Sequence, residues 1–333
     1  MQRDQIGSGL DLSALDLAEL AATVTAYAGL RDKQAIGLVS EIFETSDWLT
    51  GPGDDGAAVP FGVGTPGQVV ACGEALLPSF VARDPYGAGI AAVLTNVNDL
   101  AAMGARPLGI LNTIVADEAT AREILRGIRY GCELYDVPLL GGHLTPSDGP
   151  AALSAFGVGR ADVVLSMTHV QPGHAVLLAC ALVGEMRPDF PFFAGFRQRG
   201  ERAAGDIRLL AEVAESGAAV AAKDVSMAGI VGSLAMLLEH GRYGCRIDLA
   251  RLPIPDGVEL HRWLTCFPNY AFLLTTPVDR VEACRRMFQE RELAAEMIGV
   301  VDDSGILALT AGEHTVQVLD LHTDTITGLD PNR

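Results

Sequence analysis

The chain has 333 residues, of which 49% are hydrophobic and 20% are charged. This composition is sufficient for a full hydrophobic core and excludes an intrinsically disordered protein. The length favours two domains over one. The formal net charge of -18 excludes nucleic acid as a general partner, because a surface that follows a phosphate backbone should be basic.

The cysteines and the N-terminal segment indicate a cytoplasmic protein. None of the six cysteines belongs to a CxxC pair or to a Cys/His cluster with zinc spacing. Scattered thiols in a chain of this size are typical of buried, reduced residues. The N-terminal segment is acidic and polar, unlike a signal peptide. The longest apolar run, 175–183, is far too short to span a bilayer, so we expect no membrane association.

Hydrophobic periodicity in the first half of the chain predicts alternating helices and strands. Helical periodicity covers 12–30 and 33–44, and a loop rich in Gly, Pro and Asp follows over 47–60. The remaining predicted elements of this half, in chain order, are a strand over 68–73 that ends at Glu74, a helix over 88–103, a strand over 108–115, a helix over 119–134, a strand over 138–140, a loop over 141–149 and a strand over 151–158.

A boundary near 160–172 divides the chain into predicted domains of residues 1–160 and 161–333. The elements predicted in the second half are a strand over 175–181, a loop over 187–199, a helix ending near Gly217, a strand over 218–222, a helix capped by Ser226 and stopped at Gly241, a strand over 271–275, a helix over 279–291 and short strands over 297–320. Because strands and helices alternate in both halves, the predicted fold class is α/β or α+β.

Two common nucleotide-binding motifs are excluded by their context. Residues 51–56 and 62–67 both match G-x-G-x-x-G, but neither match follows a strand and opens a helix, as a dinucleotide site requires. The first match also carries Asp54 and Asp55, which would repel a pyrophosphate. A Walker A loop is excluded because neither lysine of the chain follows a glycine.

Asp54 and Asp55 are adjacent carboxylates in a Gly-rich loop. Such groups are hard oxygen ligands suited to magnesium, although Asp and Gly are also the usual residues of a plain turn. Glu74 follows an apolar strand and is either a further ligand or an exposed residue at a strand end. Asp99 and Asn96 share one face of an otherwise apolar helix. Buried carboxylates are scarce unless they are paired or bind a metal, which favours a functional role over a solvated face.

A pair of glycines, Gly141 and Gly142, precedes His143 after a short apolar strand. Two glycines let a backbone approach a phosphate closely. His143 is then either a ligand-facing side chain or a loop histidine without a role. The loop 187–199 is rich in Phe and Arg. It is either a substrate-facing lid or, more commonly, a loop that packs its own aromatic residues onto the domain.

Asp224 and Ser226 lie between an apolar strand and the start of a helix. Amides at such an end favour anions, and an adjacent carboxylate can bring the metal that accompanies them. An ordinary helix cap explains Ser226 fully and Asp224 partly. Lys223 either neutralises a phosphate or lies on the surface.

The order of these motifs resembles the AIR synthase-like superfamily, which includes aminoimidazole ribonucleotide synthetase, thiamine-monophosphate kinase, selenophosphate synthetase and a hydrogenase maturation factor. The resemblance covers roughly residues 50–310 in order, and its most specific part is the segment from 84 to 107. The matching segments are Gly53-Asp-Asp-Gly-Ala-Ala-Val59 with the GDDAAV loop, Asp84-Pro-Tyr-Gly87 and Asn96-Val-Asn-Asp-Leu-Ala-Ala-Met-Gly-Ala-Arg-Pro107 with the DP…G…NxxDxAAMGAxP helix, Gly141-Gly-His-Leu-Thr145 with the GG[DEH]T loop, Gln171-Pro-Gly173 with the start of the second domain, Asp224-Val-Ser226 with the D-[IV]-[ST] segment and Asn269-Tyr-Ala-Phe-Leu-Leu-Thr275 with a late strand.

The resemblance implies two α/β domains, a homodimer formed by the N-terminal domains, and ATP with several magnesium ions in the cleft between the domains. The chemistry that it implies is ATP-dependent phosphorylation of a small molecule, in which carboxylate-bound Mg²⁺ neutralises and aligns the phosphates without a Walker lysine. The magnesium ligands that it implies are Asp54, Asp55, Glu74, Asp99 and Asp224. The residues that it places near the nucleotide or substrate are Gly53, Asn96, Gly141, Gly142, His143, Lys223 and Ser226.

Several positions depart from the named branches of this superfamily. Glu74 stands where the superfamily usually has Asp, and Met227 stands where the thiamine-phosphate kinases have a second Asp. His143 is similar to the selenophosphate synthetases, but their N-terminal Cys-Gly-x-Cys-Lys loop is absent. The last four residues, 330–333, also lack the cysteine tail of the hydrogenase maturation factors.

Three hypotheses follow. The first is an ATP- and magnesium-dependent phosphotransferase or ligase acting on a small molecule, with thiamine-monophosphate kinase as the nearest named activity. The second is a nucleotide-binding, regulatory homologue without turnover, as the missing Asp at position 227 permits. The third is a structural partner in a larger assembly that uses only the dimer surface.

Overall fold

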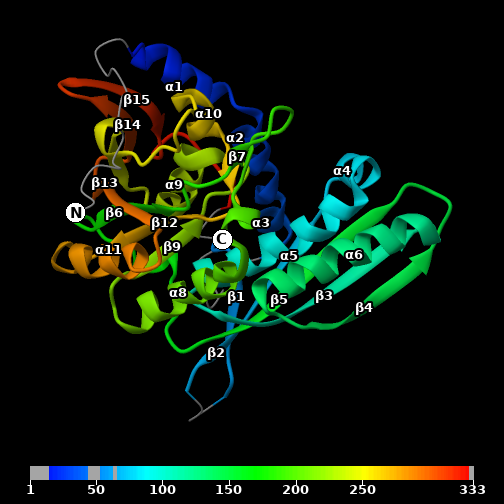
Figure 1. Ribbon diagram of the computed structural model, residues 1–333. Helices are drawn as coiled ribbons and strands as arrows, with labels where there is room; N and C mark the ends of the chain where they lie inside the picture. Colours follow the sequence, from blue (N-terminus) through cyan, green and yellow to red (C-terminus); the bar gives the residue numbers. More distant parts are fainter. Residues whose placement is uncertain (1–14, 44–52, 63–65, 330–333) are drawn as a thin grey trace. The chain divides into compact units, whose positions relative to one another are not determined.

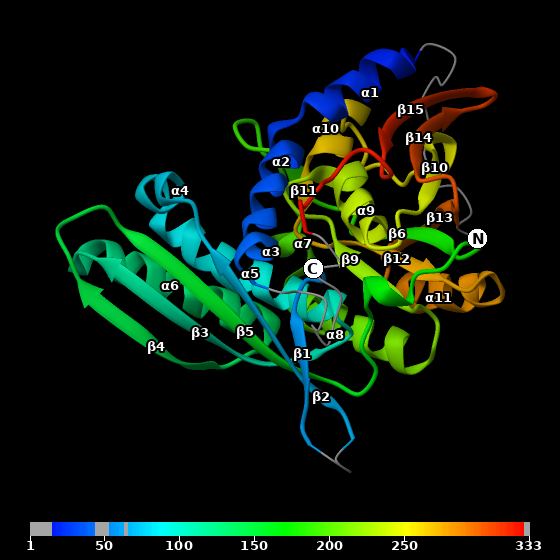
Figure 2. The same ribbon diagram turned by 180° about the vertical axis from the view of Figure 1, so that it is seen from behind.

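A computed structural model describes residues 15–43, 53–62 and 66–329 (Figures 1 and 2). The chain forms two compact units. The first unit contains the described residues of Met1–Asp54, Leu165–Gln198 and Ser216–Arg333, and the second contains those of Asp55–Val164 and Arg199–Glu215. Each unit combines helices with a mixed sheet, which confirms the predicted fold class. Among the described residues, no helix is both long and apolar enough to cross a membrane.

The second unit is built on a five-stranded sheet with the order β1-β2-β5-β3-β4. β3 and β4 pair in parallel, and the other neighbours pair antiparallel. Figures 1 and 2 show α5 and α6 together on one face of this sheet. The elements of this unit are β1 (Ala57–Pro60), β2 (Gln68–Ala75), α4 (Pro78–Arg83), α5 (Pro85–Ala102), β3 (Arg106–Ala116), α6 (Glu118–Tyr135), β4 (Leu139–Pro146), β5 (Ala152–Ala161) and α8 (Ala203–Glu215).

Helix α5 has clear sequence signals at both ends. Asp84 caps its N-terminus by accepting a hydrogen bond from the backbone of the first turn, and Pro85 occupies the first helical position. The chain leaves the helix at Gly104, which has a φ of +70°. Gly89 and Gly127 let α5 and α6 approach closely, because a Cβ at either position would overlap a backbone oxygen of the other helix. The result is a helix that is buried along most of its length.

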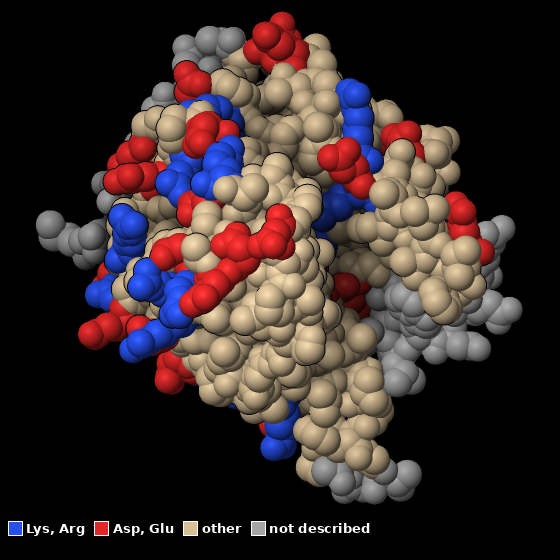
Figure 3. All heavy atoms as spheres, turned by 90° about the vertical axis from the view of Figure 1, so that its right-hand side faces the viewer, with Lys and Arg blue, Asp and Glu red and all other residues tan. Residues whose placement is uncertain are grey.

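The two faces of this sheet differ in what covers them. Residues facing the helices, such as Val70, Ile110 and Ala155, are fully buried. On the opposite face, Val59, Val115 and Phe156 remain 53%, 36% and 43% exposed. Figure 3 views the protein from the side where β4 and α6 lie in Figure 1, and shows acidic and basic side chains next to one another beside a broad area without charge. The sheet therefore carries an apolar face that no described element covers.

The first unit is built on a seven-stranded sheet with the order β15-β14-β10-β13-β6-β12-β9. Only β10 and β14 pair in parallel. A small second sheet has the order β11-β8-β7. The strands are β6 (Ala175–Cys180), β7 (Glu185–Met186), β8 (Phe192–Ala194), β9 (Ala221–Asp224), β10 (Gly244–Asp248), β11 (Phe267–Pro268), β12 (Ala271–Thr276), β13 (Ala294–Asp302), β14 (Ile306–Ala311) and β15 (His314–Asp320).

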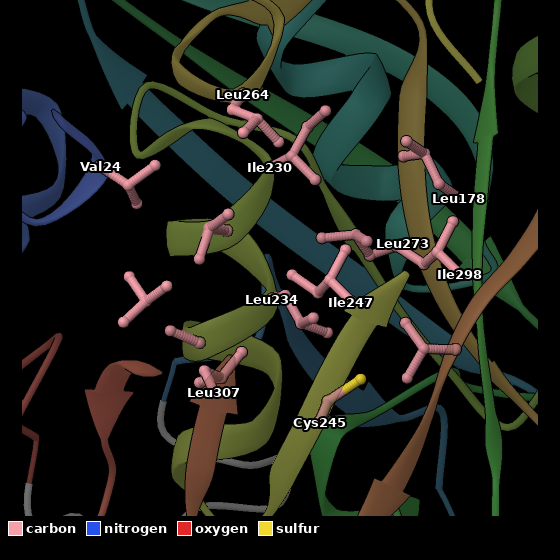
Figure 4. Close-up of a cluster of buried hydrophobic side chains, with 14 of the residues drawn as sticks. Val24, Leu178, Ile230, Leu234, Cys245, Ile247, Leu264, Leu273, Ile298 and Leu307 are labelled. Carbon is pink, nitrogen blue, oxygen red and sulfur yellow. The ribbon is translucent and has the colours of Figure 1, made fainter. Parts of the chain in front are cut away.

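The core of the first unit lies between this sheet and α9, with α1 and α10 beside it. In Figure 4, Ile230 and Leu234 of α9 point toward Ile247 and Leu273 of the sheet. All four side chains are fully buried. The described helices of this unit are α1 (Leu17–Ala26), α2 (Ala28–Arg31), η2 (Asp32–Gly37), α3 (Leu38–Ile42), η3 (Met167–His169), α9 (Gly229–Glu239), η5 (Leu249–Arg251), α10 (Leu260–Thr265), η6 (Val278–Arg280) and α11 (Val281–Gln289). Helix α7 (Phe196–Arg199) leads through η4 (Gly200–Arg202) into α8 of the second unit.

The structure corrects two sequence-based assignments in the first half. The predicted loop over 141–149 is wrong for residues up to Pro146, because β4 continues through them and pairs with β3 as far as Ala116. The predicted loop over 47–60 contains β1, which pairs with β2. The predicted helices over 12–30 and 33–44 lie partly outside the described residues, and within the described part the chain forms α1, α2, η2 and α3.

Candidate functional site

Asp54 is held in the first unit by two hydrogen bonds. Its carboxylate accepts one from Ser166 Oγ at 2.5 Å and one from the backbone N–H of Met167 at 2.8 Å. The preceding residue, Gly53, has a φ of +100°, a conformation that glycine adopts without strain. The loop is therefore fixed at Asp54 by the segment that opens η3. The sequence gives no signal for Ser166, whose partner lies far away in the chain.

Asp55 and Asp99 meet in the second unit. One carboxylate oxygen of each lies within 4.8 Å of the other, and both side chains are half-buried. Asp55 comes from the turn before β1 and Asp99 from the last turns of α5. Two carboxylates at this separation repel each other, so a cation between them would relieve the repulsion. The donor set, carboxylate oxygen only, fits a hard ion such as Mg²⁺.

Cys72 lies on the helix-covered face of the same sheet, close to the acidic pair and to a third carboxylate, that of Glu74. Cys72 and Glu74 are two residues apart on β2, so their side chains share this face. Burial raises the pKa of the Cys72 thiol, and nearby negative charges raise it further. The acidic residues that contribute are Asp99, Asp55 and Glu74. Glu74 itself is exposed, so its carboxylate is accessible to an ion.

Asn96 is fully buried in α5, and its side chain bonds within the second unit. Its Nδ2 donates to the backbone oxygen of Ala92 at 2.8 Å, and its Oδ1 lies 3.3 Å from Cys72 Sγ. These two contacts explain why a polar side chain can be buried at this position of an otherwise apolar helix. Asn96 joins α5 to β2, the strand that carries Glu74.

The Gly141-Gly142-His143 segment lies on β4 at the edge of the sheet. Gly142 is required by close packing, because a Cβ there would lie 2.4 Å from the backbone oxygen of Asn112 on β3. His143 follows Gly142 on β4, pairs with Thr113 of β3 and is exposed. Alternation along the strands puts Thr113 and His143 on the uncovered face of the sheet, opposite the face that carries Cys72 and Glu74. Within the second unit, His143 and Glu74 therefore lie on opposite faces of the sheet.

Lys223 and Asp224 end β9 in the first unit. Both are buried, at 4% and 9% exposure, and Lys223 Nζ lies 3.4 Å from Asp224 Oδ1. A surface role for Lys223 is excluded by this burial. A buried ammonium beside a carboxylate can neutralise a phosphate, which is one of the two alternatives that the sequence left open.

Ser226 does not cap α9, so the predicted cap is wrong. The helix begins at Gly229, whose φ of +73° and close approach to the backbone of Leu264 allow no side chain. The backbone N–H of Ser226 donates to Ser233 Oγ at 3.0 Å, while its own Oγ is buried without a hydrogen-bond partner among the described residues. Ser226 therefore keeps a hydroxyl that a ligand can use.

The loop over 187–199 packs its aromatic residues onto the first unit, as the commoner of its two interpretations predicted. Phe193 is buried edge-on against Trp263 with ring centroids 5.4 Å apart. Phe190 and Phe192 both contact Phe267, at 5.5 and 5.0 Å. Part of this segment forms β8 and pairs with β11. The sequence could not place these partners, because they lie more than sixty residues later in the chain.

Comparison with known proteins identifies the family. Residues 53–161 match the family described as AIR synthase related protein, N-terminal domain, and residues 189–312 match the corresponding C-terminal domain. Uncharacterized protein sll0787 of Synechocystis sp. is 32% identical over 321 residues, which cover 94% of this chain and 98% of that protein. The chain therefore belongs to the AIR synthase related family, which confirms the resemblance seen in its motifs.

Relatives with named activities are more distant. Thiamine-monophosphate kinase of Rhodopirellula baltica is 30% identical over 224 residues, covering 62% of this chain and 66% of that enzyme. Among solved structures, T. maritima PurL complexed with ADP has a TM-score of 0.75 at 16% identity, covering 95% of this chain and 52% of PurL. AaThiL complexed with AMPPCP and TMP has a TM-score of 0.64 at 20% identity, covering 87% and 98%. At these identities the solved structures show a shared fold alone.

Proposed function

We propose that this protein binds ATP with magnesium and transfers a phosphoryl group to a small molecule, as a phosphotransferase or ligase. The observation that carries this proposal is the approach of Asp55 and Asp99 to within 4.8 Å. Two half-buried carboxylates at this distance are stabilised by a divalent cation, and a cation held by carboxylates binds phosphate oxygens in turn. Phosphoryl transfer depends mainly on such charge neutralisation and alignment.

The remaining acidic residues contribute to this chemistry in different ways. Glu74 is exposed on the same face of β2 as Cys72 and offers its carboxylate to an ion. Asp54 already accepts two hydrogen bonds, but a carboxylate has about four lone-pair positions, so it can still bind a metal. Asp224 has Lys223 beside it, and in our proposal this pair provides a metal ligand together with a positive charge for a phosphate.

The other proposed binding residues divide by their geometry. We propose that Ser226 and Gly53 contact a phosphate. The hydroxyl of Ser226 is buried and has no hydrogen-bond partner among the described residues, and the backbone of Gly53 is in a conformation that favours glycine, with no side chain of its own beside the N–H. Asn96 and Gly142 are occupied in packing, so we propose that they shape the site. Gly141 and His143 lie on the edge strand, and their proposed role near the nucleotide needs a separate test. We also retain a domain boundary near residue 160 as a proposal, supported by the end of the first family match at 161.

Nucleotides in the related structures support this proposal. PurL of T. maritima has been solved with ADP and with ATP, and AaThiL with AMPPCP and TMP. Thiamine-monophosphate kinase is the named activity that we propose to test first, because a kinase of this name is 30% identical over 224 residues. The direct test is release of ADP from Mg–ATP in the presence of thiamine monophosphate and other small acceptors. Acceptor-dependent ADP release that is lost in Asp99→Asn supports the proposal.

A regulatory protein that binds ATP without turnover is the second candidate. It is favoured by Met227, which is 36% exposed. By the resemblance described above, this residue stands where the thiamine-phosphate kinases have Asp. A thioether does not bind magnesium as a carboxylate does. Mg–ATP binding without ADP release across the same acceptors distinguishes this candidate from the enzyme.

We also propose that the chain forms a homodimer through the uncovered face of the five-stranded sheet. Val59, Val115 and Phe156 are exposed together on that face. Val69 and Val158, which pair with neighbouring positions on the same face, are half-buried and apolar. A contiguous apolar sheet face of this kind is typical of a protein–protein interface, and a second copy of the same face is complementary to it.

A further inference from the structure

The C-terminal segment Thr325–Leu329 is fixed to the end of α9 by a single carboxylate. Glu239, the last residue of that helix, accepts hydrogen bonds from three donors of the segment. Its Oε1 accepts from the backbone N–H of Ile326 at 2.6 Å, and its Oε2 accepts from the backbone N–H and the Oγ1 of Thr327 at 3.1 and 2.8 Å. Hydrogen bonds to a charged acceptor are the stronger kind, and Thr327 is only 2% exposed.

Two glycines complete the attachment on the other side of the segment. Gly328 has a φ of +68° and lies directly against Gly37, where a Cβ would be 2.7 Å from the backbone oxygen of Gly328. The side chain of Gln34 donates to the backbone oxygen of Thr325 at 3.2 Å. The segment is thus held between α9 and η2 within the first unit.

The end of this segment contacts the acidic loop. Thr327 Oγ1 accepts a hydrogen bond from the backbone N–H of Leu329, which orients that residue. A Cβ placed on Gly53 would lie 3.6 Å from Leu329 Cδ1 and 3.3 Å from Met167 Cε. Leu329 and Met167 are both buried. Leu329 and Met167 therefore both lie close to Gly53, and the 166–167 segment also binds the Asp54 carboxylate.

We propose that Glu239 is a positioning residue for the acidic loop and acts through Thr327 and Leu329. It lies at one end of α9, and Asp224 and Ser226 lie just before the other end. The contacts of the C-terminal segment thus tie the Asp54 loop to the helix that follows Asp224. The expected consequence for Mg–ATP binding rests on the proposed function above, whereas the mechanical coupling of Glu239 to Asp54 does not.

The test compares the full-length chain with Glu239→Ala, Glu239→Gln and Leu329→Ala, and uses Glu290→Ala as a control at an exposed position after α11. Three quantities are measured: amide hydrogen exchange at Ile326, Thr327 and Met167, the Kd for Mg–ATP by calorimetry, and the urea midpoint of unfolding. We expect Glu239→Ala to speed exchange at all three amides and to raise the Kd about tenfold, in the range of ordinary coupling between sites. Glu239→Gln, which keeps an acceptor oxygen, should give an intermediate result.

Leu329→Ala separates positioning from stability. It keeps every hydrogen bond of Glu239 and shortens the side chain that approaches Gly53. It should speed exchange at Met167 and raise the Kd while Ile326 and Thr327 stay protected. Unchanged exchange at Met167 in both Glu239→Ala and Leu329→Ala would overturn the proposal, whatever the urea midpoint. A wild-type protein that binds no Mg–ATP would overturn the proposed function, and exchange at Met167 would still decide whether Glu239 positions the loop.

Discussion

A carboxylate oxygen of Asp55 lies within 4.8 Å of one of Asp99, although the first residue belongs to a turn and the second to a buried helix. Both side chains are half-buried, so solvent screens their repulsion less than it would at the surface. The fold therefore keeps two like charges together at a cost in stability. A cation bound between the two carboxylates removes their repulsion, and this gain in free energy strengthens its binding. The proposed function therefore rests on this pair.

Asp54 should behave as an anchor of the loop even without a metal. Asp54→Asn replaces a charged acceptor by a neutral amide and so weakens both hydrogen bonds, and we expect it to lower the free energy of unfolding by about 1–3 kcal/mol. Ser166→Ala removes one of these two hydrogen bonds together with the cap of η3, where Ser166 Oγ accepts from the backbone N–H of Thr168, and should also lower the free energy of unfolding. Urea unfolding in EDTA measures both. Equal stability of Asp54→Asn and the wild type would show that the two hydrogen bonds do not hold the loop.

The ion pair between Arg199 and Asp206 should be the most sensitive electrostatic contact of the second unit. The guanidinium meets the carboxylate with both Nε and Nη2, at 2.7 and 2.9 Å, and the side chains are only 6% and 1% exposed. Asp206→Ala removes the carboxylate that meets the buried guanidinium with two hydrogen bonds and should lower the free energy of unfolding by about 3–5 kcal/mol.

The double variant Arg199→Met/Asp206→Leu removes both charges and should recover most of that loss. Removal of the exposed partner Glu118 of Arg122 serves as the control and should change stability little. If the double variant is no more stable than Asp206→Ala, the loss does not come from a buried guanidinium deprived of its carboxylate.

The dimer proposal predicts that a charge on the uncovered sheet face disrupts association. Phe156→Asp places a carboxylate in the middle of that face, and light scattering should report a monomer with an unchanged circular dichroism spectrum. Val278→Asp is the matched control, because Val278 is 61% exposed in the first unit, outside the sheet face. A monomeric wild type, or a dimer that persists in Phe156→Asp, contradicts the proposed interface.

Stability should fall at alkaline pH because buried thiols resist ionisation. Burial raises the pKa of Cys284 to about 11 and that of Cys245 to about 12, above about 8.5 for a free thiol. Between these values the folded chain keeps protons that the unfolded chain has lost. The contribution is therefore fully present below about pH 8.5 and is lost as the pH rises toward the folded values, by about 1 kcal/mol per thiol at pH 9.5.

Urea unfolding at pH 7.5 and pH 9.5 checks this dependence. Cys284→Ala should reduce the difference in unfolding free energy between the two pH values, regardless of its effect on stability at pH 7.5. An unchanged difference in this variant would show that the alkaline loss arises from other groups.

The elements that the sequence predicted well are those with strong local signals. The apolar periodicity over 88–103 predicted α5, which the structure begins three residues earlier, at Pro85 after the cap at Asp84, and ends before Gly104. Periodicity failed where a pairing partner decides the structure. The glycines at 141 and 142 indicated a loop, yet β3 provides a parallel neighbour and β4 continues through them.

The candidate site was predictable in its acidic residues but not in what surrounds them. Local sequence could not show that Asn96 is satisfied by Cys72 and Ala92, because β2 and α5 meet only in the fold. Ser226 was assigned as a cap because Ser before an apolar run usually is one. The structure starts the helix later, at Gly229, whose positive φ breaks the helical conformation before it. His143 illustrates the same limit, since only strand register reveals which face of the sheet it occupies.

Calorimetric titration of ATP with Mg²⁺ into the wild type, Asp55→Asn and Asp99→Asn tests the central claim most directly, with Asp148→Asn as a control at an exposed loop position. Each substitution removes one carboxylate of the proposed cation site and keeps the size and shape of the side chain. We predict that the wild type and the control bind Mg–ATP and that both site variants bind it at least about tenfold more weakly, a difference of about 1.4 kcal/mol. Absence of binding by the wild type, or unchanged affinity in both site variants, would contradict the account.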